Sequence, residues 1–573
     1  MKVSKLTVAI AATLGMGASY NAIALDLYVD SKTKQIFAEP GKGRVLLGEF
    51  EKVGATPNPA LQAAPAATQA EVAAIKKDLE LKTNEIKALS EHAEAESAPS
   101  SVHVKLDDGI HFATKDGNFT ASINGRMQVD SQSNVNEGIG GSGFTGNSTT
   151  WAPNSAGVNT PSLVGGMPVA LNDGATLRRA RLGVEGTFFK NTDYKFEYDF
   201  TRGNGLNAGG ITDAYVRHNF SKPMSIKFGA FKEPFSLEEA TSNRYTTFIE
   251  RNMAVNTFVD NLNTYKVGIG ANYSADRWLV ASSLQTEGVG GYSNAYGSNS
   301  LTGSTGSAIG TNGGVNRNGG GGSTSWEVNT RVAGTPWFES KTKFLHVGAS
   351  GSYISLNNNY TATGSYSNGG VVFANGIGGN VDRTAILNTG NLTTGTNAAV
   401  PKSFQADYLT RFGAESAVVY GPFSAQAEYI QTDVSGTGYT KNESLNGYYG
   451  YATYFLTGES RNYSSKTGSW GRIKPNKNFD MKGGWGAWEL AAGYDYMNLN
   501  SGAINGGRAD TVKGGLNWYV NSHTRLMANY VHALDINVNT GTLPSTSLAA
   551  NSTTKAWNKA DLDMIETRVQ IDW

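Results

Sequence analysis

Hydrophobic and polar side chains alternate along the segment 193–200, DYKFEYDF. Tyr194, Phe196, Tyr198 and Phe200 share one face of an extended chain, and the positions between them are charged. A period of two predicts a β-strand. A soluble sheet rarely has one face that is aromatic throughout, whereas a strand with lipid on one side and water on the other needs this division. The segment therefore predicts a strand of a transmembrane β-barrel.

The end of the chain repeats the pattern. One face runs from Ile565 to Trp573, and the opposite face carries Glu566, Arg568, Gln570 and Asp572. Trp573 suits the aromatic girdle that barrels place at the membrane interface.

Sixteen segments of this kind follow one another, and single-chain bacterial barrels have an even number of strands. We predict an all-β fold, a sixteen-stranded antiparallel transmembrane β-barrel over 108–573. Its strands are expected at 118–130, 175–189, 193–202, 211–220, 224–232, 264–274, 277–287, 323–334, 344–356, 407–420, 423–433, 445–457, 486–498, 510–520, 524–533 and 564–573.

Short turns and long loops alternate between these segments, and short turns belong on the periplasmic side. Short turns are expected at 190–192, 221–223, 275–276, 421–422 and 521–523, and long loops at 131–174, 233–263, 288–322, 357–406 and 534–563. The connection 458–485 departs from this rule, because it is long and is expected in the periplasm.

The N-terminus predicts a secretory signal peptide, residues 1–24. Lys2 and Lys5 precede an apolar run, and Ala22-Ile23-Ala24 resembles a cleavage site. The run is shorter than the ~20 residues of a spanning helix, and no later segment approaches that length. A membrane protein without such helices must be a closed barrel.

Two further segments precede the barrel. Residues 25–56 predict an N-terminal periplasmic segment, and residues 57–107 a linker and a short heptad helix. Val72, Leu79 and Ile86 occupy position a, and Ile75, Lys82 and Leu89 position d. Either the segment forms a parallel, trimeric coiled coil held together by barrel oligomerisation, or it is a single amphipathic helix that acts as a spacer.

Composition narrows the function. The 573 residues include 48 basic, 48 acidic and no cysteine residues, which argues against a nucleic-acid partner, disulfides and thiolate metal sites. The seven histidines are scattered, and no HExxH or other metal or catalytic motif occurs. We therefore expect no enzyme activity, no catalytic or metal-binding residue and no cofactor.

The alternation also identifies the side chains expected to face the lumen. Strands in the first part of the barrel supply a cationic cluster with acids among it: Arg126, Arg179, Arg181, Lys195, Arg217 and Lys227, with Glu185, Asp199 and Asp213. Arg178 falls on the lipid-facing parity, where arginine costs ~2–4 kcal/mol at mid-membrane. It must lie at the rim, or a bulge must turn it inward.

Guanidinium groups stay charged and offer forked donors to phosphate or carboxylate oxygens. Conduction needs weak binding at several sites, and interleaved acids temper the attraction. The alternative is that these charges only solvate and brace the wall.

The barrel resembles the phosphate-selective porin O/P family. The resemblance rests on NGR at 124–126, LRRAR at 177–181, DYKFEYDF at 193–200, ITDAY at 211–215, FKEPFSLEEATS at 231–242, FIER at 248–251, FSAQAEY at 423–429, YFLTGESRNY at 454–463, IKP at 473–475, GAWEL at 486–490, LNWYVN at 516–521 and ANYV at 528–531. It implies a homotrimer in outer-membrane lipid and an inward-folded third loop, 233–263, that narrows the pore. The constriction residues that it implies are Arg126, Arg178, Arg179, Lys195 and Asp213.

The third loop adds Arg244 and Arg251 to the candidate pore residues. It also holds Glu239, where phosphate-selective members place a lysine. The leading hypothesis is a porin for passive diffusion of small anions such as phosphate. A general or carboxylate porin without phosphate selectivity is one alternative, and a structural or adhesive envelope protein is another.

Overall fold

The computed structural model describes residues 25–30, 36–37, 44–50, 65–97, 102–106, 109–138, 149–153, 159–163, 171–201, 210–260, 265–288, 326–356, 358–360, 366–368, 372–382, 384–390, 392, 405–437, 443–538 and 557–573. The expected signal peptide, 1–24, lies outside them. The chain divides into two compact units, Met1–Glu94 and Ala95–Trp573, and each is described by itself.

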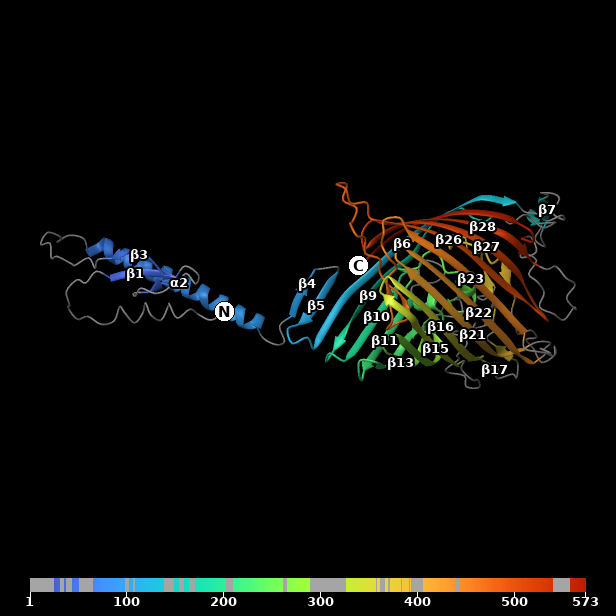
Figure 1. Cartoon of the computed structure of the whole chain (residues 1–573), viewed down its shortest axis with the longest axis horizontal. Coiled ribbons are helices and arrows are strands. Elements are labelled where there is room, and N and C mark those ends of the chain that lie inside the picture. The colour runs from blue at the N-terminus through green and yellow to red at the C-terminus, as the bar shows by residue number, and fades with distance from the viewer. Residues whose placement is uncertain are drawn as a thin grey trace. The chain divides into compact units, whose positions relative to one another are not determined.

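The second unit is a closed antiparallel barrel of sixteen strands (Figure 1), which confirms the predicted fold. The strands are β6 (Phe119–Gly138), β9 (Gly174–Phe188), β10 (Thr192–Asp199), β11 (Gly210–Asn219), β12 (Met224–Lys232), β13 (Tyr265–Ser274), β14 (Trp278–Gly288), β15 (Trp326–Ser340), β16 (Lys343–Ser355), β21 (Gln405–Tyr420), β22 (Phe423–Thr437), β23 (Glu443–Phe455), β26 (Ala487–Ser501), β27 (Ile504–Tyr519), β28 (Thr524–Asn537) and β29 (Asp561–Asp572). Each overlaps one of the expected segments.

The barrel closes where β29 pairs with β6, from Asp561 opposite Gly138 to Asp572 opposite Arg126. The carboxyl-terminal Trp573 completes the seam, because its backbone exchanges two hydrogen bonds of 3.1 Å with Gly125. β6 continues beyond this point, and there β5 (Ile110–Thr114) pairs with it. β5 in turn pairs with β4 (Val102–Lys105).

The short turns gather at one end of the barrel. Neighbouring turns are hydrogen-bonded to one another: Ser274 N–H donates to Pro223 C=O at 2.6 Å, and Gly421 N–H donates to Thr342 C=O at 2.7 Å. The C-terminus lies at this end, and the hairpin strand β7 lies at the other (Figure 1). Because short turns face the periplasm in such barrels, we call it the periplasmic end.

The two faces of the strands differ as the alternation predicts. Phe196 and Phe200 on the outer face are 48% and 57% exposed, whereas Glu197 on the inner face is 1% exposed. Arg126 is buried inside the barrel beside Glu197, and Lys195 lies on the same inner face. Neither cation is directed at lipid.

Arg178 turns inward at a β-bulge. In the pairing of β6 with β9, Gln128 lies opposite Arg179 and the next residue, Val129, lies opposite Leu177. Arg178 is therefore the extra residue of β9, and its side chain reaches Glu250 inside the barrel. The bulge is one of the two solutions that the sequence requires, and it avoids the cost of placing a guanidinium in lipid.

Three segments between strands carry elements that pack inside the barrel. The inner loop, residues 233–260, holds the helices α3 (Leu237–Ala240) and α4 (Met253–Phe258). Residues 372–392 hold β19 (Ala374–Asn375) and β20 (Leu387–Asn388). The periplasmic loop, residues 456–486, holds β24 (Tyr463–Ser464) and β25 (Ser469–Trp470). Two other hairpins are β7 (Thr149–Pro153) with β8 (Asn159–Leu163) and β17 (Asn358–Tyr360) with β18 (Tyr366–Asn368).

The first unit contains a small sheet in the order β2-β1-β3, with β1 at Leu25–Asp30, β2 at Ile36–Phe37 and β3 at Arg44–Phe50. The helix α2 spans Pro65–Ser97, and its heptad residues Leu79, Ile86 and Leu89 are each more than half exposed. Among the described helices, none is both long and apolar enough to cross a membrane.

Candidate functional site

Wall carboxylates fasten the inner loop by the backbone N–H groups at the starts of its helices. Glu428 of β22 accepts hydrogen bonds from the N–H groups of Leu237 and Glu238, at 3.1 and 2.8 Å. Asp495 of β26 accepts one from Met253 N–H at 2.7 Å. The first N–H groups of a helix have no partner within the helix, so each carboxylate satisfies donors that would otherwise be buried unpaired.

Wall cations fasten the same loop by its carbonyl groups and acids. Arg411 of β21 donates to Phe258 C=O and to Glu233 Oε1, both at 2.7 Å. Arg525 of β28 donates to Thr246 C=O at 2.7 Å, and Arg568 of β29 to Ile249 C=O at 2.6 Å. The loop is therefore held at both ends and in its middle, and side chains of the barrel wall fix its position.

The inner loop also packs through apolar contacts. Phe258 of α4 lies in a T-shaped contact with Phe373, with ring centroids 5.4 Å apart. Both belong to one buried apolar cluster that includes the wall residues Leu409 and Ile430. The later strands therefore present apolar as well as polar side chains inward. The reason is that these strands form a core with the inner loop.

Two arginine clusters, each centred on a buried acid, lie where the earlier strands meet the inner loop. The loop supplies Arg244 to the first cluster and Glu250 to the second, and β29 supplies Arg568 to the second. In the first, Glu197 lies 3.0 Å from Arg126 Nη2, 2.8 Å from Arg181 Nη1 and 3.7 Å from Arg244 Nη2. Asp199 pairs with Arg181 at 2.7 Å. Three guanidinium groups thus share two carboxylates, and Arg126 also donates to the Asn243 side chain.

In the second cluster, Glu250 lies 2.8 Å from Arg178, 2.9 Å from Arg568 and 3.9 Å from Arg179. Asp130 pairs with Arg568 at 2.6 Å. Burial raises the pKa of the Glu250 carboxyl, but the three guanidinium groups outweigh that effect and hold the pKa well below its usual range. This cluster also has one guanidinium more than it has carboxylates.

Partly exposed charges line the inner face of β10 to β12. Lys195 lies 3.3 Å from Glu185 and 3.8 Å from Asp213, and 22% of its side chain is exposed. Arg217 pairs with Asp193 at 2.6 Å. Lys227 lies over the rings of Tyr215 and Phe231, 5.0 and 4.0 Å from their centroids. Water and solutes can reach this part of the wall.

Glu239 occupies a different environment from the one expected of a pore residue. It is fully buried and pairs with Lys232 and with Arg251, whose Nε is 3.0 Å away. Arg251 also pairs with Asp260 at 3.2 Å. These ion pairs hold the loop together, and the assignment of Glu239 and Arg251 to anion binding stays a prediction.

The structure thus gathers Arg126, Arg181 and Arg244 around one acid and Arg178 and Arg179 around another. The residues that sequence reasoning left out are the anchors from the later strands, above all Arg411, Arg525 and Arg568. Their inward parity is readable in the sequence, and the alternation of the last strand predicts Arg568 on its polar face, but nothing local shows that they bind the inner loop.

The periplasmic loop accounts for the long connection at 458–485. Trp470 N–H donates to Thr241 Oγ1 at 3.2 Å, and Trp470 Nε1 donates to Gln426 at 2.6 Å. Arg472 pairs with Asp572 of β29. The loop therefore turns back into the periplasmic end of the lumen and contacts the inner loop.

Residues 169–547, about two thirds of the chain, match the family described as "Phosphate-selective porin O and P". Porin O of Pseudomonas aeruginosa is 28% identical over 455 residues, which cover 76% of this chain and 87% of that protein. An uncharacterized protein of Caulobacter vibrioides is 28% identical over 362 residues, 63% of each chain.

Solved structures with some likeness include OmpT of Vibrio cholerae, with a TM-score of 0.42, 12% identity, and coverage of 80% of this chain and 100% of that one. Another is an anion-selective porin from Comamonas acidovorans, with a TM-score of 0.38, 9% identity, and coverage of 79% and 100%. Because the family match spans most of the barrel, the chain belongs to the phosphate-selective porin O and P family of the bacterial outer membrane.

Proposed function

We propose that the barrel conducts small anions, phosphate among them, by passive diffusion past the inner loop, along the partly exposed charges on the inner face of β10 to β12. One observation carries this proposal: both arginine clusters hold three guanidinium groups against two carboxylates. The surplus positive charge lies where the inner loop meets the wall, and there it attracts anions and repels cations.

The surplus positive charge is distributed over several guanidinium groups rather than concentrated at one, and this distribution suits conduction. Each guanidinium near the constriction already shares a carboxylate, so a passing oxyanion exchanges one charge-assisted hydrogen bond for another. Binding is then weak enough for release. Phosphate and small carboxylates both match forked donors. The family description and the likeness to Porin O favour phosphate.

We expect Lys195→Gln to lower the anion-to-cation permeability ratio by roughly fivefold. A unit charge about 8 Å from a passing ion contributes on the order of 1 kcal/mol at an effective dielectric of about 20 with physiological screening. The measurement is the reversal potential across a planar bilayer in a potassium chloride gradient. Lys222→Gln, an exposed position in a short periplasmic turn, is the matched control. A cation preference of the wild-type channel would reject the proposal.

We further propose that the protein is a homotrimer and that α2 forms a parallel coiled coil with its two copies. Leu79, Ile86 and Leu89 are 66%, 65% and 64% exposed in the single chain, although apolar side chains at heptad spacing pack together in a bundle. Linkage to an oligomeric barrel raises the effective concentration of these helices. Lys82 at position d forms an ion pair with Glu85 at 2.9 Å.

Leu79→Glu is expected to lower the temperature at which the trimer dissociates in detergent, because it places three carboxylates in the core of the bundle. Leu81→Glu is the matched control, since Leu81 is 59% exposed but lies at position c of the heptad. Seminative electrophoresis after stepwise heating measures the transition. Equal effects of the two substitutions would favour a helix that acts as a spacer.

A further inference from the structure

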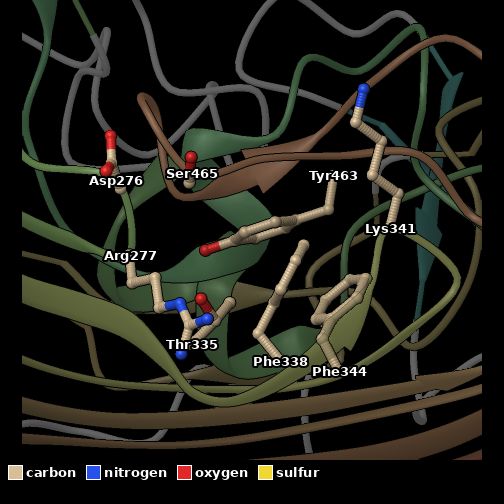
Figure 2. Close-up of a pocket in the computed structure, with 8 residues that line it drawn as sticks. All are labelled: Asp276, Arg277, Thr335, Phe338, Lys341, Phe344, Tyr463 and Ser465. Carbon is tan, nitrogen blue, oxygen red and sulfur yellow. The ribbon is translucent and has the colours of Figure 1, made fainter.

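A cavity of about 210 Å³ lies at the periplasmic end of the lumen wall. Arg277 and Lys341 come from two short turns, Phe338 and Phe344 from β15 and β16, and Tyr463 from the periplasmic loop (Figure 2). Phe338 pairs with Phe344 across the two strands, on the inner face of the barrel. None of these residues belongs to the two arginine clusters, so the cavity is distinct from the constriction.

Three aromatic rings form the apolar part of the cavity. The centroids of Phe338 and Phe344 are 6.2 Å apart with their planes at 28°, and those of Phe344 and Tyr463 are 5.1 Å apart. Tyr463 is fixed by a hydrogen bond of 2.7 Å between its hydroxyl and His346 Nδ1. Trp470 contacts the rings of both Phe344 and Tyr463. The rings are thus held in place by the wall and by the folded-back loop.

Arg277 lies beside these rings and, among the residues that the structure describes, forms no ion pair. The guanidinium of Arg277 lies 5.5 Å from the centroid of Phe338, and Thr335 N–H, donating to Arg277 C=O at 2.9 Å, ties the turn to β15. Within the described part of the chain, no carboxylate oxygen lies within 4.0 Å of Arg277 or Lys341. By contrast, the neighbouring Lys343 pairs with Glu339 at 3.1 Å.

Figure 2 shows how these groups are directed. Arg277 extends its guanidinium toward Thr335 at one end of the cavity, and Tyr463 lies across the middle above Phe338. The carboxylate of Asp276 points away from the rings, and Lys341 stands at the opposite side. The end that holds Arg277 is therefore the place for a negative group, and the aromatic middle is the place for a flat apolar one.

We propose that this cavity binds a small aromatic monocarboxylate, with its carboxylate on Arg277 and its ring against Phe338, Phe344 and Tyr463. Pockets for drug-sized ligands measure roughly 300–1,000 Å³, so the volume here suits a single ring. Inorganic phosphate would satisfy Arg277 but would gain nothing from the aromatic surface. Because Asp276, Arg277 and Lys341 of two short periplasmic turns line the cavity, the ligand reaches it from water rather than from lipid.

The probe is 4-fluorobenzoate, whose fluorine resonance broadens when it binds to the full-length protein in detergent micelles. We expect Arg277→Gln to weaken binding by at least roughly tenfold, because a charge-assisted hydrogen bond to the carboxylate is lost. Lys466→Gln is the matched control, since Lys466 is an exposed cation next to Ser465 at the rim and does not line the cavity. 4-Fluorobenzamide, which keeps the ring and removes the charge, is expected to bind the wild type as weakly as 4-fluorobenzoate binds the Arg277→Gln variant.

Phe338→Leu provides a second, independent variant. It keeps an apolar side chain at a position that is 36% exposed and removes one stacking surface, so it should weaken 4-fluorobenzoate while leaving Arg277 in place. Absence of broadening with the wild type, or equal affinities for the Arg277→Gln and Lys466→Gln variants, would overturn the assignment. The measurement involves no transport, so its failure leaves the selectivity of the pore to be decided separately by the reversal potential.

Discussion

Arg411→Leu is expected to lower the free energy of unfolding of the barrel by about 3–5 kcal/mol and to raise its single-channel conductance. Removing one partner of a buried ion pair leaves an uncompensated charge, and such changes cost about that much. Arg411 is 3% exposed, and Glu233, its partner at the start of the inner loop, is also 3% exposed. The substitution also removes the hydrogen bond to Phe258 C=O, so the loop loses an anchor at each end and widens the lumen.

Denaturant titration of tryptophan fluorescence in lipid vesicles gives the free energy, and planar bilayer recording gives the conductance. Arg508→Leu is the matched control, because Arg508 pairs with Asp535 at 2.7 Å while both side chains remain about 40% exposed, and pairs of that kind contribute about 0–1 kcal/mol. Adding Glu233→Gln to Arg411→Leu should restore part of the loss. If the two arginine variants were equally stable, the anchoring role of Arg411 would be wrong.

Trp470→Ala is expected to cost about 3–5 kcal/mol, as for other buried large aromatic residues, and to increase the conductance. Trp470 is 3% exposed and joins three parts of the protein. It donates to Gln426 of the wall, its N–H donates to Thr241 of the inner loop, and the Arg461 guanidinium lies 4.1 Å from the centroid of its ring. Losing the ring frees the periplasmic loop to leave the lumen.

Trp485→Ala removes the same side chain from the same loop at a position that is 70% exposed, and exposed substitutions usually stay within about 0.5 kcal/mol. The two variants should therefore differ in stability and in conductance alike. A Trp470→Ala channel with unchanged conductance would show that the periplasmic loop does not restrict the path of ions, whatever happens to stability.

Much of the fold could be predicted from the sequence because, within each strand, residues suited to lipid alternate with residues suited to the lumen. The adjacent residues Phe196 and Glu197, for example, face lipid and the lumen respectively. This alternation is local, so it can be recognised without knowledge of distant contacts. Because a guanidinium in lipid is costly, the sequence predicts either a bulge or a rim position for Arg178, and the structure has the bulge.

The interior of the lumen was less predictable because it depends on partners far apart in sequence. Lys232 and Arg251 enclose Glu239, a candidate pore residue, and no periodicity encodes that pairing. Arg411 and Glu233 form an ion pair although they are 178 positions apart in the sequence. The sequence predicts a periplasmic position for the connection 458–485, but its return into the lumen depends on the wall residues that contact Trp470 and Arg472.

The seam at Trp573 has a consequence for how the protein avoids association with other chains. β29 ends opposite Arg126, so the part of β6 before Gly125 would offer unpaired backbone groups there, and such exposed edges invite pairing with foreign strands. β5 covers residues 120–123 of that edge. β5, which precedes the barrel strands in the chain, thus protects the edge at the barrel closure from aggregation. This role is separate from any connection that the segment makes to the helix α2.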